Sequence, residues 1–273
     1  MTRGFVAALI CLLALVVPGG EGPARACVAP RPGPPPRVLF VGNSYTRFNN
    51  LARTVARISE SVPGGVTLRT AAVAHPGWDL SRHWYAHEAR TEIRRGRYTH
   101  VVLQGHSMSA IADPDEFAGF ARLFAEQAAA TGARTVLYET WARRGGSFFY
   151  RRGRGHDAQL DSSEDMQQRV SALYTDVARE LAADLAPAGR AFLRAGELLP
   201  HADQLLYQRD GSHPTQAGTY LAGLVIYGTI THRDPRRVRY RPYPMTREVG
   251  ESLREIAWQT LQAQPRLTAA LPH

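Results

Sequence analysis

The chain has 273 residues, of which 44% are hydrophobic and 21% charged, and it carries a formal net charge of +9 at pH 7. The length allows one domain with a substantial core, and after the first 26 residues no segment is apolar enough to span a membrane, which excludes a membrane-spanning domain. The basic charge leaves two interpretations open: contact with anionic cell-surface polymers, or an ordinary arginine-rich surface.

Residues 1–26 have the pattern of a secretory signal peptide. Arg3 precedes an uncharged run over residues 4–17, and the segment ends in Ala24-Arg25-Ala26, an A-x-A cleavage pattern. We therefore expect cleavage after Ala26 and a secreted or extracytoplasmic protein. Cys27 would then be the only cysteine left, which excludes an internal disulfide. A lipoprotein anchor at Cys27 is an alternative that the spacer before it matches poorly.

The proline-rich residues 27–36 predict an extended linker, followed by a single domain over residues 37–273. Within this domain, apolar runs predict strands at residues 37–41, 66–73, 99–103, 135–138 and 184–188. Helical spacing predicts helices at residues 51–61, 81–95, 114–130, 163–183 and 215–229. This alternation indicates an α/β fold: a three-layer α/β/α sandwich around a central parallel sheet. In such sheets functional groups gather beyond the carboxyl ends of the strands.

Two short segments carry the residue types of a serine nucleophile and its base. Gly42-Asn43-Ser44 leaves the first predicted strand, so the Ser44 hydroxyl and its own N–H can face one cleft. Asp210-Gly211-Ser212-His213-Pro214-Thr215 forms a tight turn in which the carboxylate and the imidazole reach the same site. Serine requires an imidazole base, which in turn requires a carboxylate to fix its tautomer. Ser44, His213 and Asp210 fit these roles.

On these segments the chain resembles the SGNH (GDSL-type) hydrolase family, whose fold is flavodoxin-like. The resemblance implies that Ser44 is the nucleophile, and that Asp210 and His213 are the acid and base of a C-terminal D-x-x-H block. It further implies that the N–H groups of Ser44 and of Gly77, in His75-Pro76-Gly77-Trp78, bind the oxyanion. No cofactor or metal is implied.

The third family block departs from the usual G-x-N-D, because Leu103-Gln104-Gly105-His106-Ser107 contains no asparagine. It is similar to the Q-G-E type of carbohydrate-acting branches, which implies Gln104 as the third oxyanion donor, with His106 as the other candidate and as a substrate contact. A competing interpretation is an α/β-hydrolase nucleophile elbow at Ser107. The elbow pattern is G-x-S-x-G, and this chain has Ser109 at the position of the second glycine.

Residues 143–154 mix arginine, glycine and aromatic residues, and we interpret them as a wall or lid over the cleft rather than as a nucleic-acid-binding segment. Trp141 and Tyr150 are candidates to stack on a sugar ring, with ordinary packing as the equal alternative. His83 and His87 are spaced i, i+4, which suits a metal, but without a third ligand we expect a solvated helix face.

The sequence therefore predicts an exported serine esterase that removes short acyl groups, acetyl first, from a carbohydrate or other polar substrate. The partner is a small-molecule or glycan ester, with neither nucleic acid nor a membrane span involved. The alternatives are a lipase or thioesterase with the same triad, an enzyme using Ser107, and a non-catalytic cell-surface binding module.

Overall fold

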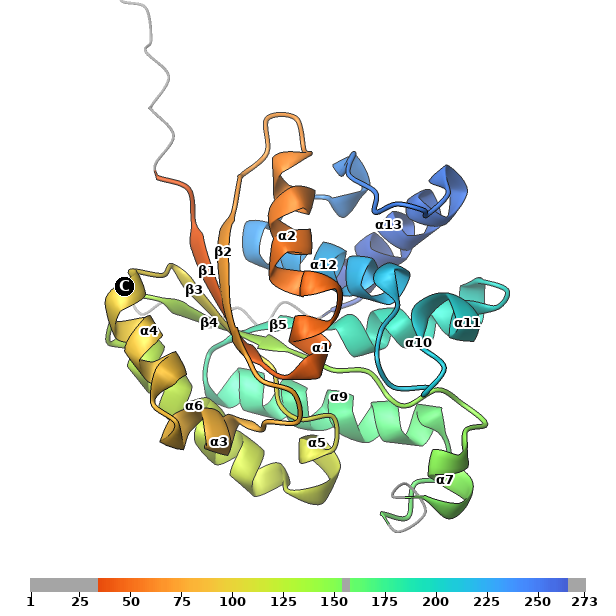
Figure 1. Cartoon of the computed structure of the whole chain (residues 1–273), viewed down its shortest axis with the longest axis horizontal. Helices are drawn as coiled ribbons and strands as arrows, with labels where there is room; N and C mark the ends of the chain where they lie inside the picture. The colour runs from red at the N-terminus through yellow and green to blue at the C-terminus, as the bar shows by residue number, and fades with distance from the viewer. Residues whose placement is uncertain (1–33, 154–157, 265–273) are drawn as a thin grey trace, which may run out of the picture. The chain divides into compact units, whose positions relative to one another are not determined.

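A computed structural model describes residues 34–153 and 158–264 (Figure 1). The predicted signal peptide, Cys27 and most of the proline-rich linker lie outside these residues. Among the described residues, no helix combines the length and apolar character needed to cross a bilayer.

Five parallel strands form one sheet in the order β2-β1-β3-β4-β5. Their bounds are Arg37–Gly42 (β1), Arg69–Ala74 (β2), His100–Leu103 (β3), Arg134–Tyr138 (β4) and Asp184–Ala186 (β5). The interior strand β1 lies in register with both neighbours, since Val41 pairs with Val73 of β2 and with Leu103 of β3. The strands are short runs of valine, leucine and other apolar residues, which suit a sheet covered on both faces.

Alternate residues of each strand supply the two faces of the sheet. Val38 and Phe40 belong to one hydrophobic core, and Leu39 and Val41 belong to the other. The first core is covered by α2 (Leu51–Glu60), α10 (Ala188–Leu198), α12 (Gln216–Thr231) and α13 (Arg247–Gln262). The second is covered by α3 (Leu80–Tyr85), α4 (Glu88–Gly96), α6 (Pro114–Ala129) and α9 (Ser163–Glu180). The predicted three-layer α/β/α sandwich is confirmed (Figure 1).

Short helices connect these elements at the edge where the strands end. They are α1 (Ser44–Arg47), α5 (Ser109–Ala112), α7 (Phe148–Arg152), α11 (Ala202–Leu206) and the 3-10 turn η1 (Phe48–Asn50). A second 3-10 turn, η2 (Pro235–Arg237), lies between α12 and α13. The helix α12 is buried over nearly its whole circumference, because α2 packs beside it and α13 packs over it.

Two predictions about helices were wrong. The helix expected at residues 81–95 is two helices, α3 and α4, because the backbone at His87 has a φ of +63° and breaks the helix there. The helix expected at residues 215–229 is not the last one, since α13 follows it with Leu253 and Ile256 turned into the core. Residues 232–246, which precede α13, are rich in proline and arginine, so the sequence analysis took them as the end of the regular structure and did not predict the helix after them.

Candidate active site

The predicted site residues lie beyond the carboxyl ends of adjacent strands. Ser44 follows β1, Gly77 follows β2, Gln104 and His106 follow β3, and Trp141 follows β4. Because all five strands are parallel, these ends share one edge of the sheet. The loop between α11 and α12, which contains Asp210 and His213, reaches the same edge.

The turn that carries Ser44 is fixed by its own side chains. The Asn43 side chain accepts the N–H of Tyr45 at 3.1 Å and donates to the carbonyl of Trp78 at 3.1 Å. Glycine is required at position 42, where a Cβ atom would lie 2.6 Å from the Gln104 Oε1. The turn therefore places Ser44 at the start of α1 with little freedom.

The loop with Asp210 and His213 is a closed turn. The Gln208 N–H donates to the carbonyl of His213 at 2.7 Å, and the Gly211 N–H donates to the carbonyl of Gln208 at 2.9 Å. Gly211 has a φ of +66°, a left-handed conformation that glycine adopts without strain. Thr215 then caps α12 by accepting two backbone N–H groups.

The structure brings Ser44, His213 and Asp210 together. The Oγ of Ser44 lies 3.0 Å from the Nε2 of His213, and the Nδ1 of His213 lies 2.5 Å from an oxygen of Asp210. When the Nδ1 hydrogen is donated to Asp210, Nε2 is free to accept the serine hydrogen. This is the arrangement in which a histidine can deprotonate a serine.

Hydrogen bonding keeps Asp210 ionised. Burial by itself would raise the pKa of the Asp210 carboxyl, but hydrogen bonds from the His213 ring and from the N–H groups of Ser212 and His213 outweigh it. The pKa of Asp210 therefore lies below its usual range, and the side chain is a carboxylate at neutral pH.

A column of stacked aromatic rings joins the two halves of the triad. Trp141 lies between Tyr45 and Phe192, with ring centroids 4.6 and 4.1 Å apart and the rings nearly parallel. Its indole N–H donates to the carbonyl of Ser212 at 2.9 Å, and the Tyr45 hydroxyl lies 2.7 Å from the Ser212 hydroxyl. The prediction that Trp141 stacks on a sugar was wrong, because the side chain is fully buried in this column.

An exposed aromatic residue that the sequence analysis did not identify lies on the triad instead. The Phe48 ring stacks on the His213 ring with centroids 4.4 Å apart, and 37% of Phe48 is exposed. Phe48 follows α1 directly. The only indication in the sequence that Phe48 belongs to the site was its position shortly after Ser44.

The prediction of Gln104 as an oxyanion donor does not agree with its contacts. Its Nε2 donates to the Oδ1 of Asn43 and to the carbonyl of Gly105, while its Oε1 accepts the Asn43 N–H at 2.9 Å and the Thr46 hydroxyl at 2.9 Å. The side chain is 1% exposed. Gln104 therefore braces the nucleophile turn and has no donor left to offer a substrate.

Two other residues were predicted to contact the oxyanion, His106 and Gly77. His106 is partly buried, and its Nδ1 accepts the N–H of Met108 at 3.3 Å, so the hydrogen of the neutral ring lies on Nε2. Gly77 is exposed with a φ of +74°, in a turn held against the nucleophile turn by the bond from Asn43 to Trp78.

The alternative nucleophile Ser107 is not arranged as one. It is 5% exposed, and its hydroxyl accepts a hydrogen bond from the Nη2 of Arg143 at 3.2 Å. The histidine that faces a serine hydroxyl is His213, and the serine is Ser44. The geometry therefore favours Ser44.

Two further predictions about single side chains were wrong. Tyr150 is 7% exposed and donates its hydroxyl hydrogen to the carbonyl of Arg143, so it is a packing residue and not a sugar platform. His83 is not on a solvated face: it is 1% exposed, burial lowers its pKa, and its Nε2 donates to the carbonyl of Gly42 at 2.8 Å. Over residues 34–153 and 158–264, no three His, Cys, Asp or Glu side chains are grouped to hold a metal ion.

A buried carboxyl lies beneath the segment that follows β4. Glu139 is fully buried, and its Oε1 accepts hydrogen bonds from Gln167 at 3.2 Å and from the Arg190 N–H at 3.0 Å. Burial raises the pKa of Glu139 to about 7, although the Arg190 guanidinium opposes the shift. Gln167 in turn accepts the N–H of Ala142 at 2.8 Å, which connects Glu139 to the backbone beside the triad.

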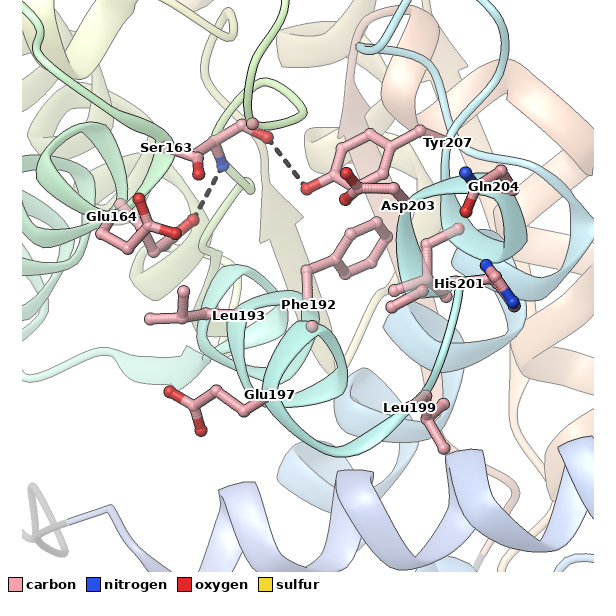
Figure 2. A pocket seen from close by; sticks show the side chains of 16 residues that line it. Ser163, Glu164, Phe192, Leu193, Glu197, Leu199, His201, Asp203, Gln204 and Tyr207 are labelled. Atoms are coloured by element: carbon pink, nitrogen blue, oxygen red, sulfur yellow. Dashed lines mark hydrogen bonds between the residues drawn. The ribbon is translucent and has the colours of Figure 1, made fainter.

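A cavity of about 450 Å³ lies on the other side of that backbone, between α9, α10 and α11 (Figure 2). Phe192 and Tyr207 line it, and the Tyr207 hydroxyl donates to the carbonyl of Ala142 at 3.1 Å. None of the three triad residues lines this cavity. Its charged lining residues include Glu164, Glu197 and Asp203.

Comparison with known proteins adds the family. No protein-family model matches the chain, and no curated protein matches it. Among solved structures, a protein from Slackia heliotrinireducens, provisionally described as an SGNH hydrolase, is 28% identical with a TM-score of 0.61, covering 72% of this chain and all of that one.

Two more distant structures share the fold. A DUF4886 family protein from Bacteroides uniformis is 15% identical with a TM-score of 0.68, covering 84% of this chain and 96% of that one. An acetylxylan esterase from Geobacillus stearothermophilus is 16% identical with a TM-score of 0.56, covering 76% and 97% of the two chains. The sheet order, the position of the serine after β1 and these similarities together support an SGNH-type hydrolase, a serine enzyme that acts on ester bonds.

Proposed function

We propose that the protein hydrolyses short acyl esters, acetyl esters first, of a carbohydrate or other polar substrate, with Ser44, His213 and Asp210 as a catalytic triad. The observation that carries this proposal is the pair of contacts at His213, 3.0 Å to the Ser44 hydroxyl and 2.5 Å to Asp210. These contacts supply the base and its orienting carboxylate.

In the first half of the reaction the Ser44 oxygen bonds to the ester carbonyl carbon while its hydrogen passes to the Nε2 of His213. Asp210 stabilises the imidazolium that forms. The negative charge on the carbonyl oxygen is met by the N–H groups of Ser44 and Gly77, and His106 is the remaining side-chain candidate for the third donor. The carbon–oxygen bond to the alcohol then breaks, and the alcohol leaves with the hydrogen from His213.

In the second half a water molecule gives its hydrogen to His213 and attacks the acyl-enzyme. The acid is released and the Ser44 hydroxyl is restored.

The preference for short acyl groups follows from packing. Beneath the triad the space is filled by Tyr45, Trp141 and Phe192, whose ring planes stack without a gap. A long acyl chain has no route in that direction. The acetylxylan esterase fold neighbour makes acetylated xylan the first polymer to test.

Covalent labelling tests the nucleophile. A fluorophosphonate probe should label the purified protein at Ser44, and labelling should vanish in Ser44→Ala and persist in Ser107→Ala. Label on Ser107 would instead support the elbow assignment, and the absence of any label would support a binding module. Rates on 4-nitrophenyl esters of two to twelve carbons should fall with chain length, whereas a preference for long chains would indicate a lipase or thioesterase.

Export is part of the same proposal. It rests on the pattern of residues 1–26, with cleavage after Ala26. N-terminal sequencing of the protein recovered outside the cytoplasm should begin at Cys27. A mature chain that still begins at Met1 would exclude this route.

A further inference from the structure

The arginine that follows the end of β4 is a partly buried cation with little to neutralise it. The Arg143 guanidinium donates to the Ser107 hydroxyl at 3.2 Å and lies 5.3 Å from the centre of the Phe149 ring. Its Nε is buried without a hydrogen-bond partner, and among residues 34–153 and 158–264 no carboxylate forms an ion pair with it. A cation held out of water without an opposite charge is costly, so such an arrangement is typical of a site that receives an anion.

This guanidinium lies next to the triad. Its charge acts on the buried Tyr45 hydroxyl, where it opposes the increase in pKa that burial causes. The Tyr45 ring in turn lies edge-on to the His213 ring, with centroids 5.8 Å apart. One aromatic ring therefore separates Arg143 from the catalytic histidine.

A second arginine covers the loop that carries the triad's acid and base. The Arg144 N–H donates to the carbonyl of Gly211 at 2.8 Å. Its side chain runs along the same glycine, because a Cβ atom added to Gly211 would lie 3.2 Å from the Arg144 Cβ and 3.6 Å from its Nε. Arg143 and Arg144 thus lie on the β4 side of Ser44, away from the Gly77 turn on the β2 side.

The triad carboxylate on this side, Asp210, is already engaged by His213. Among the described residues no carboxylate therefore neutralises Arg143, and its charge can act on a ligand. A guanidinium binds carboxylate and phosphate through paired, charge-assisted hydrogen bonds, which gives both affinity and orientation.

We propose that Arg143 and Arg144 form an anion-binding subsite beside Ser44, and that the natural ester substrate carries a carboxylate or a phosphate close to the ester bond. This inference rests on the proposed function and narrows it from polar esters to anionic ones. The subsite holds the substrate on the β4 side of the nucleophile and takes no part in bond making or breaking.

Matched substrates provide the test. We would compare kcat/KM for O-acetylated glucuronic acid, for its neutral methyl ester and for O-acetylated glucose 6-phosphate. The acid, the phosphate or both should exceed the methyl ester by about 10- to 100-fold, the size expected for hydrogen bonds to a charged group. The compound that gains more identifies the anion as a carboxylate or a phosphate.

Variants then assign the preference to the subsite. Arg143→Met should reduce the ratio of charged to neutral kcat/KM to near one, and Arg144→Met should reduce it in part. Arg247→Met is the matched control, because Arg247 lies exposed on α13 and pairs with Glu251 there, so the ratio should not change. A measurement on the unaltered protein supplements the variants: free glucuronate should inhibit 4-nitrophenyl acetate hydrolysis competitively, and glucose should not.

The subsite is rejected if the unaltered protein hydrolyses charged and neutral esters at equal rates, or if its preference survives both substitutions. Either result leaves the esterase proposal intact. The esterase proposal fails on different grounds, namely when no ester is hydrolysed and Ser44 is not labelled.

Discussion

Two regions of the molecule share one stretch of backbone and differ in almost every other respect. The triad edge has the polarised contacts of Ser44 and His213, with Arg143 beside them. The cavity between α9, α10 and α11 has about 450 Å³ of space and acidic residues in its lining, but no nucleophile facing a base (Figure 2). Ala142 lies between the two. The comparison teaches that a large hollow and the reactive site need not coincide, because chemistry requires aligned donors and acceptors and not volume alone.

The strongest test of this comparison removes the nucleophile. Ser44→Ala should lower kcat for 4-nitrophenyl acetate by about 10⁴-fold or more, because the remaining groups cannot form an acyl-enzyme. Asp203→Asn, which changes a charge in the cavity lining, should change kcat by less than about twofold. Equal losses in both variants would mean that the cavity takes part in the reaction.

The second test concerns the buried carboxyl beneath the shared backbone. Because the pKa of Glu139 is raised to about 7, the folded protein binds this proton more tightly than the unfolded chain does. The stability that protonated Glu139 contributes is thus complete below the ordinary pKa of 4.5 and is lost as the pH rises through 7. The free energy of unfolding should fall by about 3 kcal/mol at most.

Urea unfolding between pH 4.5 and 8 measures this slope. Glu139→Gln, whose amide stays neutral, should flatten the slope over that interval. The Asp210 carboxyl has a lowered pKa, so its contribution to stability is lost in the other direction, as the pH falls below about 4. Further unfolding measurements at pH 3 to 4 should show this loss in the variant as well. An unchanged slope between pH 5 and 7 would show that Glu139 is ionised throughout.

The third test compares two rings of the column that borders both regions. Trp141→Phe keeps an aromatic ring but removes the donor to the Ser212 carbonyl, so we expect a loss of about 1 to 3 kcal/mol in stability and about a tenfold drop in kcat. Phe192→Leu, on the cavity side, should cost less than about 1.5 kcal/mol and leave kcat within twofold. If both variants lose the same activity, the hydrogen bond to Ser212 is not what positions His213.

The smallest expected effect belongs to the cavity. Gly196 lies in α10 where an added Cβ would meet no atom within 4 Å, so Gly196→Ala should stabilise the protein by about 0.5 to 1 kcal/mol without changing kcat. Gly119 in α6 has the same open surroundings away from the cavity and serves as the matched variant. A loss of activity in Gly196→Ala alone would give the cavity a role that its contacts do not indicate.

The strands and the layered fold were predictable because each buried strand is a short apolar run between helical segments, a pattern typical of a parallel sheet covered on both faces. The loop of Asp210 and His213 was predictable for a local reason: residues three apart around a glycine reach the same place whatever surrounds them. The expectation that this loop meets Ser44 required the order of the strands, which the resemblance supplied.

Other features depend on partners distant in sequence, and local patterns could not supply them. Gln104 was expected to face the substrate, but its amide is used by Asn43, 61 residues away. Trp141 was a candidate to stack on a sugar ring, whereas its indole N–H donates to the carbonyl of Ser212, 71 residues away. The break at His87 comes from a single positive φ angle, which the helical spacing of the surrounding residues does not reveal.

The separation of 169 residues between Ser44 and His213 has a consequence for folding. Ser44 and His213 come together only when β1 and the loop before α12 have docked, so hydrolysis cannot begin before that step. Recovery of turnover after dilution from denaturant would therefore report this long-range docking, whereas the circular dichroism of the helices would report local structure.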